Sequence, residues 1–242
     1  MYSRPVISRA FCAQVKRLHE MHSGWADITM VAGVSEDLSA QICAEEGFQF
    51  NWFDNFPLSD KWNLTLDFAI YNNPDYDYIC IMGDDDFMSD KLFIEYVPFI
   101  KMNIAHFGVQ SMYVCSAEQN RAIYFKYKEE SRLIGAGRMI SKRLIDAIRN
   151  EHPEPEIGLW ESGLNRGLDS SLEKRCAAFT VAVPVMTSEV YITDVKTKQN
   201  LWPFEKFEAI GDEVPVEKAL QNLGLKEIEI IKSYYDKNVQ KT

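Results

Sequence analysis

The sequence predicts an α/β protein in which helices flank a doubly wound, mainly parallel sheet. Helical and strand patterns alternate up to residue 86 with short connections, which is typical of strand–helix–strand crossover units. Continuous apolar runs at residues 28–34 and 78–82 indicate strands that are buried on both faces, as in parallel sheets. In such folds ligands bind at the carboxyl ends of the strands.

The first half of the chain supplies this alternation. A short extended start at Ser3 to Ile7 is expected to precede an amphipathic helix from about Arg9 to His22, where apolar residues recur at helical spacing. The remaining elements expected here are a strand at 28–34, a helix at 37–46 ended by Gly47, a strand at 48–53, a helix capped by Ser59 and a strand at 78–82.

The second half changes character, because antiparallel pairing is expected to join the sheet. Two β-rich runs, 109–115 and 121–127, predict a hairpin. The other expected elements are a helix at 141–149, strands at 178–186 and 188–194, and two helices at 216–223 and 226–237 split by Gly224. We expect one domain over residues 1–207 and a C-terminal helical extension, 208–242, packed on the same domain.

Length and composition indicate a globular protein without a membrane-spanning segment. At 242 residues with 46% hydrophobic and 26% charged residues, the chain suits one large globular domain. No apolar stretch approaches the roughly 20 residues that cross a bilayer, so we expect no membrane insertion and a soluble, cytoplasmic protein, in the host cytoplasm if it is viral. The five cysteines form no CxxC pair and are expected to be reduced and mostly buried.

Charge is distributed unevenly along the chain. A net charge of −10 argues against general affinity for nucleic acid. The segment from Arg121 to Arg149, however, contains eight basic and three acidic residues, which gives it a local charge of +5. This segment is interpreted either as a solvated face or as a track for a phosphate-bearing ligand.

Three adjacent carboxylates, Asp84, Asp85 and Asp86, follow the apolar strand at 78–82. Carboxylates this close repel one another, and a divalent cation would neutralise them. Because alternate side chains of an extended chain point the same way, Asp84 and Asp86 are expected to converge on one ion, or on one ion and a sugar hydroxyl. The alternative is a solvated acidic turn, since a three-residue motif arises easily by chance.

Several motifs occur in an order that resembles the GT-A class of nucleotide-sugar-dependent glycosyltransferases, especially glycosyltransferase family 2. The resemblance spans roughly residues 1 to 200 and implies a Rossmann-like GT-A fold with residues 1–207 as its catalytic domain. Its pieces are Val31 to Asp37, Lys61-Trp62-Asn63, Met82-Gly83-Asp84-Asp85-Asp86, Gly135 to Lys142 and Gly167 to Leu172.

The resemblance implies a nucleotide-diphosphate sugar as donor, with a UDP-sugar expected, and Mn²⁺ or Mg²⁺ as cofactor. Asp84 and Asp86 would hold the metal, which bridges the donor's diphosphate, while Asp85 would face the sugar or ribose. Elementary chemistry agrees with this arrangement. The diphosphate leaving group gains negative charge in the transition state, and a Lewis acid stabilises that charge where it develops.

A carboxylate beyond the glycine-rich segment acts as general base in inverting members of this class, and Asp169 fits that place. Such a base removes the proton of the acceptor hydroxyl as the hydroxyl attacks the anomeric carbon. The alternative role of Asp169 is to cap the helix that follows it. Glu161 is the second candidate base, and Trp160 beside it is interpreted either as a sugar-stacking residue or as a core residue.

The resemblance also implies donor-binding residues elsewhere. Lys61 and Lys196 are candidates for binding the diphosphate, and Gly137 for contacting the donor from the glycine-rich segment. Members of the class often add a metal ligand from the C-terminal half, commonly histidine. Since no histidine follows His152, Asp194 is expected to take that role, on the same face of a strand as Lys196.

The nucleotide base or ribose is expected near the N-terminal residues Arg4, Pro5 and Ser8, at the end of a very short first strand. Pro5 has the alternative role of fixing a turn.

Three functions remain open. The first is a metal-dependent glycosyltransferase that moves a sugar to an acceptor hydroxyl. The second is a sugar-phosphate nucleotidyltransferase, although the glycine-rich phosphate loop of such enzymes is missing near the N-terminus. The third is a non-catalytic nucleotide- or carbohydrate-binding module. Acceptors that fit the first function include phosphate-bearing molecules such as modified nucleic acid, polysaccharides and lipid carriers.

Overall fold

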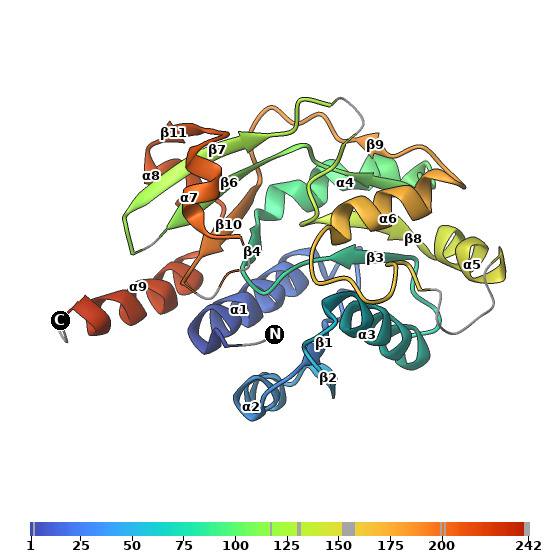
Figure 1. The fold of residues 1–242 in the computed structure, drawn as a ribbon, viewed down its shortest axis with the longest axis horizontal. Helices are drawn as coiled ribbons and strands as arrows, with labels where there is room; N and C mark the ends of the chain where they lie inside the picture. Colours follow the sequence, from blue (N-terminus) through green and yellow to red (C-terminus); the bar gives the residue numbers. More distant parts are fainter. Residues whose placement is uncertain are drawn as a thin grey trace.

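The computed structural model describes residues 1, 3–116, 118–129, 132–151, 158–198, 200 and 202–239, the last six of them by backbone only. Figure 1 shows helices packed around two larger sheets, with a small two-stranded sheet at one edge. The helices are α1 (Pro5–His22), α2 (Asp37–Glu46), α3 (Leu58–Asn72), α4 (Asp90–Lys101), α5 (Lys142–Glu151), α6 (Leu168–Ala177), α7 (Phe204–Glu208), α8 (Val216–Leu220) and α9 (Leu225–Val239).

The strands are β1 (Val31–Val34), β2 (Gln49–Trp52), β3 (Tyr78–Ile81), β4 (Asp86–Met88), β5 (His106–Gly108), β6 (Ser111–Ser116), β7 (Arg121–Lys126), β8 (Arg138–Ser141), β9 (Val183–Pro184), β10 (Ile192–Lys196) and β11 (Asp212–Val214). They form a pair β1-β2, a five-stranded sheet β11-β7-β6-β10-β4 and a four-stranded sheet β3-β8-β5-β9. The predicted α/β class is therefore confirmed.

The direction of strand pairing differs from the prediction. Three pairs are parallel, namely β1-β2, β10-β6 and β5-β9, but β3 pairs antiparallel with β8, with Ile79 opposite Ile140. Of the strand pairs between described residues, most are antiparallel, so the sheets are mixed rather than mainly parallel. An apolar run indicates that a strand is buried on both faces. It does not indicate whether the neighbouring strand is parallel or antiparallel, because both kinds of pairing can be buried.

Several local predictions are confirmed. The helix at 37–46 ends as expected at Gly47, whose N–H bonds to carbonyls of the last turn. The hairpin is β6-β7, and α5, α8 and α9 lie close to their predicted positions. The strand predicted at 178–186 is wrong except for β9, because the chain after α6 first turns back on the helix end, where the Phe179 and Thr180 N–H groups donate to the Cys176 carbonyl.

The N-terminal prediction is wrong. Residues from Pro5 onward are helical, so α1 replaces the expected short strand. Proline is favoured at the first position of a helix, because its fixed φ suits the helix and its missing N–H would have no partner there. Similarly, Pro57 rather than Ser59 is the N-cap of α3, while the Ser59 hydroxyl accepts a hydrogen bond from the Leu164 N–H at 2.9 Å.

The main hydrophobic core lies between α4 and the strands, and includes Leu92, Tyr96, Phe107 and Ile192, all essentially unexposed. Helix α9 packs beside α1 and closes the lower left of Figure 1. Residues 208–242 are not purely helical, because β11 pairs with β7 at the edge of the five-stranded sheet. The C-terminal helix α9 therefore packs on α1, the helix that Arg4 caps and that contains Ser8.

Among the described helices, none combines the length and apolar content that a bilayer-spanning segment needs. All five cysteines are free, and all but Cys80 are buried, as expected.

Acid is expected to destabilise the fold through His106 of β5. Both ring nitrogens are buried without a hydrogen-bond partner among the described residues. Burial, reinforced by the charge of Arg138, lowers the pKa of His106 from 6.5 to about 4. The unfolded chain therefore binds a proton that the folded chain does not, so this stability is complete above pH 6.5, declines as the pH falls below 6.5 and is lost by about pH 4.

Urea unfolding at pH 7 and pH 5 measures this effect. His106→Leu should lose about 2 kcal/mol less stability between the two pH values than the wild type. An identical pH dependence in the two proteins would show that His106 is protonated in the folded state.

Candidate functional site

The predicted acidic motif links two sheets. Strand β3 ends at Ile81, and the loop through Asp84 and Asp85 leads into β4, which begins at Asp86. Antiparallel pairing of β4 with β10 places Asp86 opposite Asp194, and the Val195 N–H donates to the Asp85 carbonyl at 2.8 Å. The three adjacent carboxylates of the motif and Asp194, which is distant in the sequence, thus lie close together.

Asp84 is held by the start of α1. The Ser8 hydroxyl donates to its Oδ2 at 2.6 Å, and the Arg4 guanidinium forms an ion pair with its Oδ1. Both oxygens of Asp84 therefore have partners from the N-terminal segment. Arg4 and Ser8, which were expected near the nucleotide base or ribose at the end of a strand, instead lie at the start of α1 and contact the acidic motif. Pro5, the first residue of that helix, is between them in sequence.

Asp85 lies between two cations. Arg4 Nη1 is 2.6 Å from its Oδ2, Lys196 Nζ is 3.9 Å from the same oxygen, and the Asn200 amide donates to it. Burial alone would raise the pKa of Asp85, but the positive charges of Arg4 and Lys196 outweigh it and lower the pKa. Asp85 is therefore an ionised carboxylate at neutral pH.

Asp86 and Asp194 have fewer partners. The Gly83 N–H donates to Asp86 Oδ2 at 2.7 Å. Lys196 Nζ lies 2.5 Å from Asp194 Oδ2, which confirms that Asp194 and Lys196 share a face of β10. Asp194 Oδ1 is buried and has no hydrogen-bond partner among the described residues. Asp86 and Asp194 are the carboxylates with coordinating capacity left.

Burial and mutual repulsion disfavour charge on this pair. Burial, together with the negative charges of Asp85 and Asp194, raises the pKa of Asp86 well above its usual value. Burial raises the pKa of Asp194 to about 6, although Lys196 opposes the shift. A cation between Asp86 and Asp194 would relieve both penalties.

The geometry changes the predicted metal set. Asp84 and Asp86 do not converge as expected, because Asp84 turns to Arg4 and Ser8 while Asp86 faces Asp194. No group of three or more His, Cys, Asp or Glu side chains in the described part of the chain is arranged to hold a metal. Mg²⁺ and similar ions, however, are commonly bound by one or two carboxylates together with substrate phosphates. The pair Asp86–Asp194, with its unpartnered oxygen, fits that kind of site.

Lys61 lies on α3 and, unlike Lys196, forms no ion pair with a carboxylate of the acidic motif among the described residues. Its Nζ donates to Asn55 Oδ1 at 3.0 Å and to the Met1 carbonyl at 3.4 Å. Burial lowers the pKa of Lys61, while the nearby charge of Asp84 opposes the shift. Lys61 thus contributes to the positive field around the acidic motif without a direct ion pair to it.

The glycine-rich segment lies against the end of β3. Gly137 has φ of +72°, a conformation that favours glycine, and its N–H donates to the Ile81 carbonyl at 2.8 Å. Gly135 allows close approach of a catalytic candidate, because a Cβ there would lie only 2.3 Å from Asp169 Oδ1. Asp169 therefore lies against a loop that is bonded to the strand leading into Asp84.

Asp169 is in the first turn of α6, whose N-cap is Gly167 with no side-chain cap. The alternative that Asp169 caps this helix is wrong. Its carboxylate is half-buried and accepts no hydrogen bond from any described residue, while its backbone carbonyl accepts one from Arg138 at 3.4 Å. An available carboxylate of this kind can receive a proton from a bound hydroxyl.

Glu161 and Trp160 lie on a loop anchored to α3. Asn63 bonds both backbone groups of Trp160, at 2.8 Å and 3.1 Å. Trp160 is 3% exposed, which makes it a core residue and not a sugar-stacking surface. Glu161 is exposed.

The basic residues of the segment 121–149 do not form one continuous surface for a phosphate-bearing ligand. Arg138 is fully buried, and several of the other basic residues are already in ion pairs. These pairs are Arg121 with Glu208 and Glu213, Arg132 with Glu173, Lys142 with Asp146, and Arg149 with Asp67. Of the two interpretations of this segment, this pairing favours a solvated face over a track for a phosphate-bearing ligand, and Arg138 belongs to the core.

Sequence reasoning missed two residues that position the site. Gln14 of α1 is 1% exposed and binds the free edge of β4, donating to the Asp86 carbonyl at 3.2 Å and accepting from the Met88 N–H. Arg138 ties the glycine-rich segment to α6, donating to the Asp169 carbonyl at 3.4 Å and to Glu173 Oε1 at 3.5 Å. The signal for Gln14 was a polar residue on the apolar face of the helix, three residues after Phe11.

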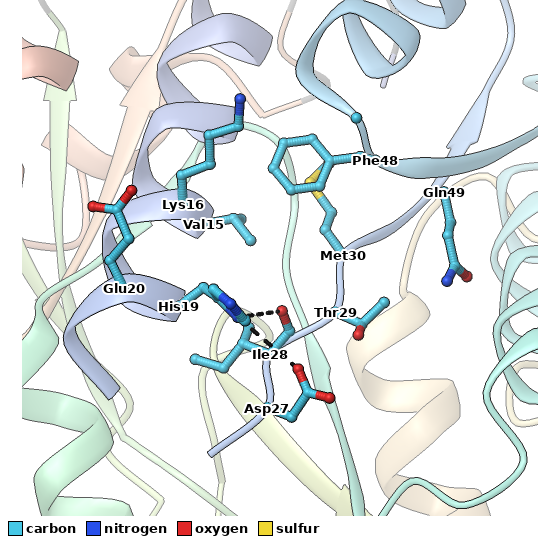
Figure 2. Close-up of a pocket in the computed structure, with 11 residues that line it drawn as sticks. Val15, Lys16, His19, Glu20, Asp27, Ile28, Thr29, Met30, Phe48 and Gln49 are labelled. Carbon is cyan, nitrogen blue, oxygen red and sulfur yellow. Dashed lines mark hydrogen bonds and ion pairs between the residues drawn. The ribbon is translucent and has the colours of Figure 1, made fainter. Parts of the chain in front are cut away.

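A separate pocket of about 290 Å³ lies between α1 and the chain before β1. Figure 2 shows Lys16, His19 and Glu20 on one side of it and Ile28 to Met30 and Phe48 on the other. None of the predicted site residues lines this pocket.

The chain matches no protein-family model, and no curated protein is significantly similar to it. The resemblance to GT-A enzymes therefore rests on the sequence motifs alone.

Proposed function

We propose that the protein is a metal-dependent glycosyltransferase that moves a sugar from a nucleotide-diphosphate sugar, a UDP-sugar in the first instance, to an acceptor hydroxyl. The observation that carries the proposal is the buried acidic cluster at the end of β3, where Asp86 faces Asp194 and the cations Arg4, Lys61 and Lys196 lie around the carboxylates. Carboxylates paired with nearby cations suit a ligand that arrives as a metal complex of a diphosphate.

Asp86 and Asp194 would hold Mn²⁺ or Mg²⁺, which supplies Lewis-acid stabilisation of the departing diphosphate. Arg4 and Lys196, which both lie at ion-pair distance from Asp85, would bind diphosphate oxygens. Gly137 and the loop before Asp84 would form the wall beside the sugar.

Asp169 is proposed as the general base. Its carboxylate has no hydrogen-bond donor among the described residues, so it is free to accept the proton of the acceptor hydroxyl. Glu161 is the second candidate. Because so many basic residues of 121–149 are already paired, a phosphate-bearing acceptor is not part of the proposal.

A panel of UDP-, GDP-, ADP- and dTDP-sugars, each with Mn²⁺ or with EDTA, tests the proposal by thermal unfolding and calorimetry. We expect one nucleotide class to raise the melting temperature by about 5 to 10 °C near 100 times its dissociation constant, in Mn²⁺ only. Slow release of free sugar should accompany binding. Binding without any turnover would instead support a non-catalytic module, and no binding by any donor would contradict the proposal.

A further inference from the structure

Arg4 is an internal cation for two carboxylates of the acidic cluster, beside the pair Asp86–Asp194 that would hold the metal. Its guanidinium spans two neighbouring carboxylates, reaching Asp85 at 2.6 Å and forming a second ion pair with Asp84. The side chain is only 15% exposed. Planar guanidinium groups bridge carboxylates well, because their N–H donors are fixed in a fork.

Lys196 completes this internal neutralisation on the other side. Its Nζ lies 2.5 Å from Asp194 and 3.9 Å from Asp85. Four carboxylates are thereby matched by two cations, with Asp194 Oδ1 left buried and unpartnered in the described structure. A divalent ion that approaches Asp86 and Asp194 meets two positive charges nearby, and like charges this close in a buried site oppose one another strongly.

We propose that Arg4 is an exchangeable internal counter-ion, which holds Asp84 and Asp85 in the free protein and moves to the donor's diphosphate when the metal–nucleotide complex binds. The inference rests on the proposed function, which supplies the diphosphate. Metal alone would then bind weakly, because Arg4 has no other anion to turn to. Metal and nucleotide would bind together, because the diphosphate receives Arg4.

The position of Arg4 in the chain suits such a movement. It is the N-cap residue of α1, with a non-helical φ of −136°; its carbonyl accepts the first helical hydrogen bond from the Ser8 N–H at 2.9 Å, but its side chain makes no cap hydrogen bond. Ser8, one turn further along, keeps its own hydrogen bond to Asp84 at 2.6 Å. Asp84 would therefore stay in place when Arg4 leaves it.

The test measures two affinities in Arg4→Met: that for Mn²⁺ without nucleotide, from the electron paramagnetic resonance of free Mn²⁺, and that for UDP with Mn²⁺, by calorimetry. Methionine keeps much of the side-chain length and removes the charge. We expect Mn²⁺ alone to bind at least about tenfold tighter, because one repelling charge is gone. We expect UDP to bind at least about tenfold more weakly, because one phosphate partner is lost.

The opposite directions of these two changes distinguish exchange from damage, since a misfolded site would lose both affinities. Arg4→Lys, which keeps the charge without the fork, should give intermediate values and guards against failure of the methionine variant to fold. Arg9→Met is the matched control, because Arg9 lies on the same helix and pairs instead with Glu45 at 2.7 Å. Its two affinities should equal those of the wild type.

Unchanged or weaker Mn²⁺ binding in Arg4→Met would overturn the inference whether or not UDP binds. Tighter Mn²⁺ binding in a protein that binds no nucleotide would support Arg4 as a counter-ion that competes with metal, and would overturn its transfer to a diphosphate together with the proposed function.

Discussion

Replacing Asp169 with asparagine is expected to lower turnover by about 10²–10⁴-fold, the usual cost of losing a general base, while affinity for the donor stays within about twofold. Asparagine has nearly the same shape, and the Asp169 side chain caps no helix, so the fold should not change. The carboxylate lies over Gly135 without a hydrogen-bond donor among the described residues, which leaves proton acceptance as the property that asparagine removes.

The measurement compares single-turnover rates with donor affinities for the donor that the panel identifies. Asp146→Asn is the matched control, since Asp146 is a surface carboxylate that pairs only with Lys142 on α5. Equal losses of turnover and donor affinity in Asp169→Asn would assign this residue to binding. Full activity in Asp169→Asn, combined with loss in Glu161→Gln, would move the base to Glu161.

Donor binding in Mn²⁺ is expected to weaken by about 100-fold or more in Asp86→Asn. Replacing a residue that only orients a ligand typically costs 10–100-fold in metal affinity, and a direct ligand should cost at least as much. Asp86 is one of two facing carboxylates with coordinating capacity, so its loss leaves Asp194 to hold the ion. EDTA should reduce wild-type binding to a similar level.

The same substitution is expected to raise thermal stability. Burial and the neighbouring carboxylates raise the pKa of Asp86, which means that the folded state disfavours its ionised form at neutral pH. A neutral asparagine avoids this cost. A variant that is more stable but binds less donor is the expected signature of a functional carboxylate kept at the expense of stability.

Asp90→Asn serves as the control for this pair of measurements. Asp90 is four residues further along, at the start of α4, and contacts Arg17 at 3.5 Å without touching the acidic cluster. It should leave donor affinity unchanged. If Asp86→Asn binds donor as well as Asp90→Asn does, Asp86 is not a metal ligand.

Much of the local structure follows from the sequence alone, because the relevant forces act between near neighbours. The hairpin β6-β7 and the helix α5 were predictable from local sequence patterns, and Gly47 predicted the end of α2. The acidic motif after a buried strand was equally visible. So was the shared face of Asp194 and Lys196, since alternate residues of a strand point the same way.

Long-range pairing was decided by the tertiary structure. An apolar run such as residues 78–82 shows that a strand is buried but not which strand it joins, and β3 pairs antiparallel with β8. Likewise, the charges of Asp84, Asp85 and Asp86 predict a neutralising cation without naming it. Arg4 meets two of them because Pro5 starts a helix instead of ending a strand, and Asp194 meets the third because β10 returns beside β4. Which charges meet depends on the path of the backbone between them, and only the folded chain determines that path.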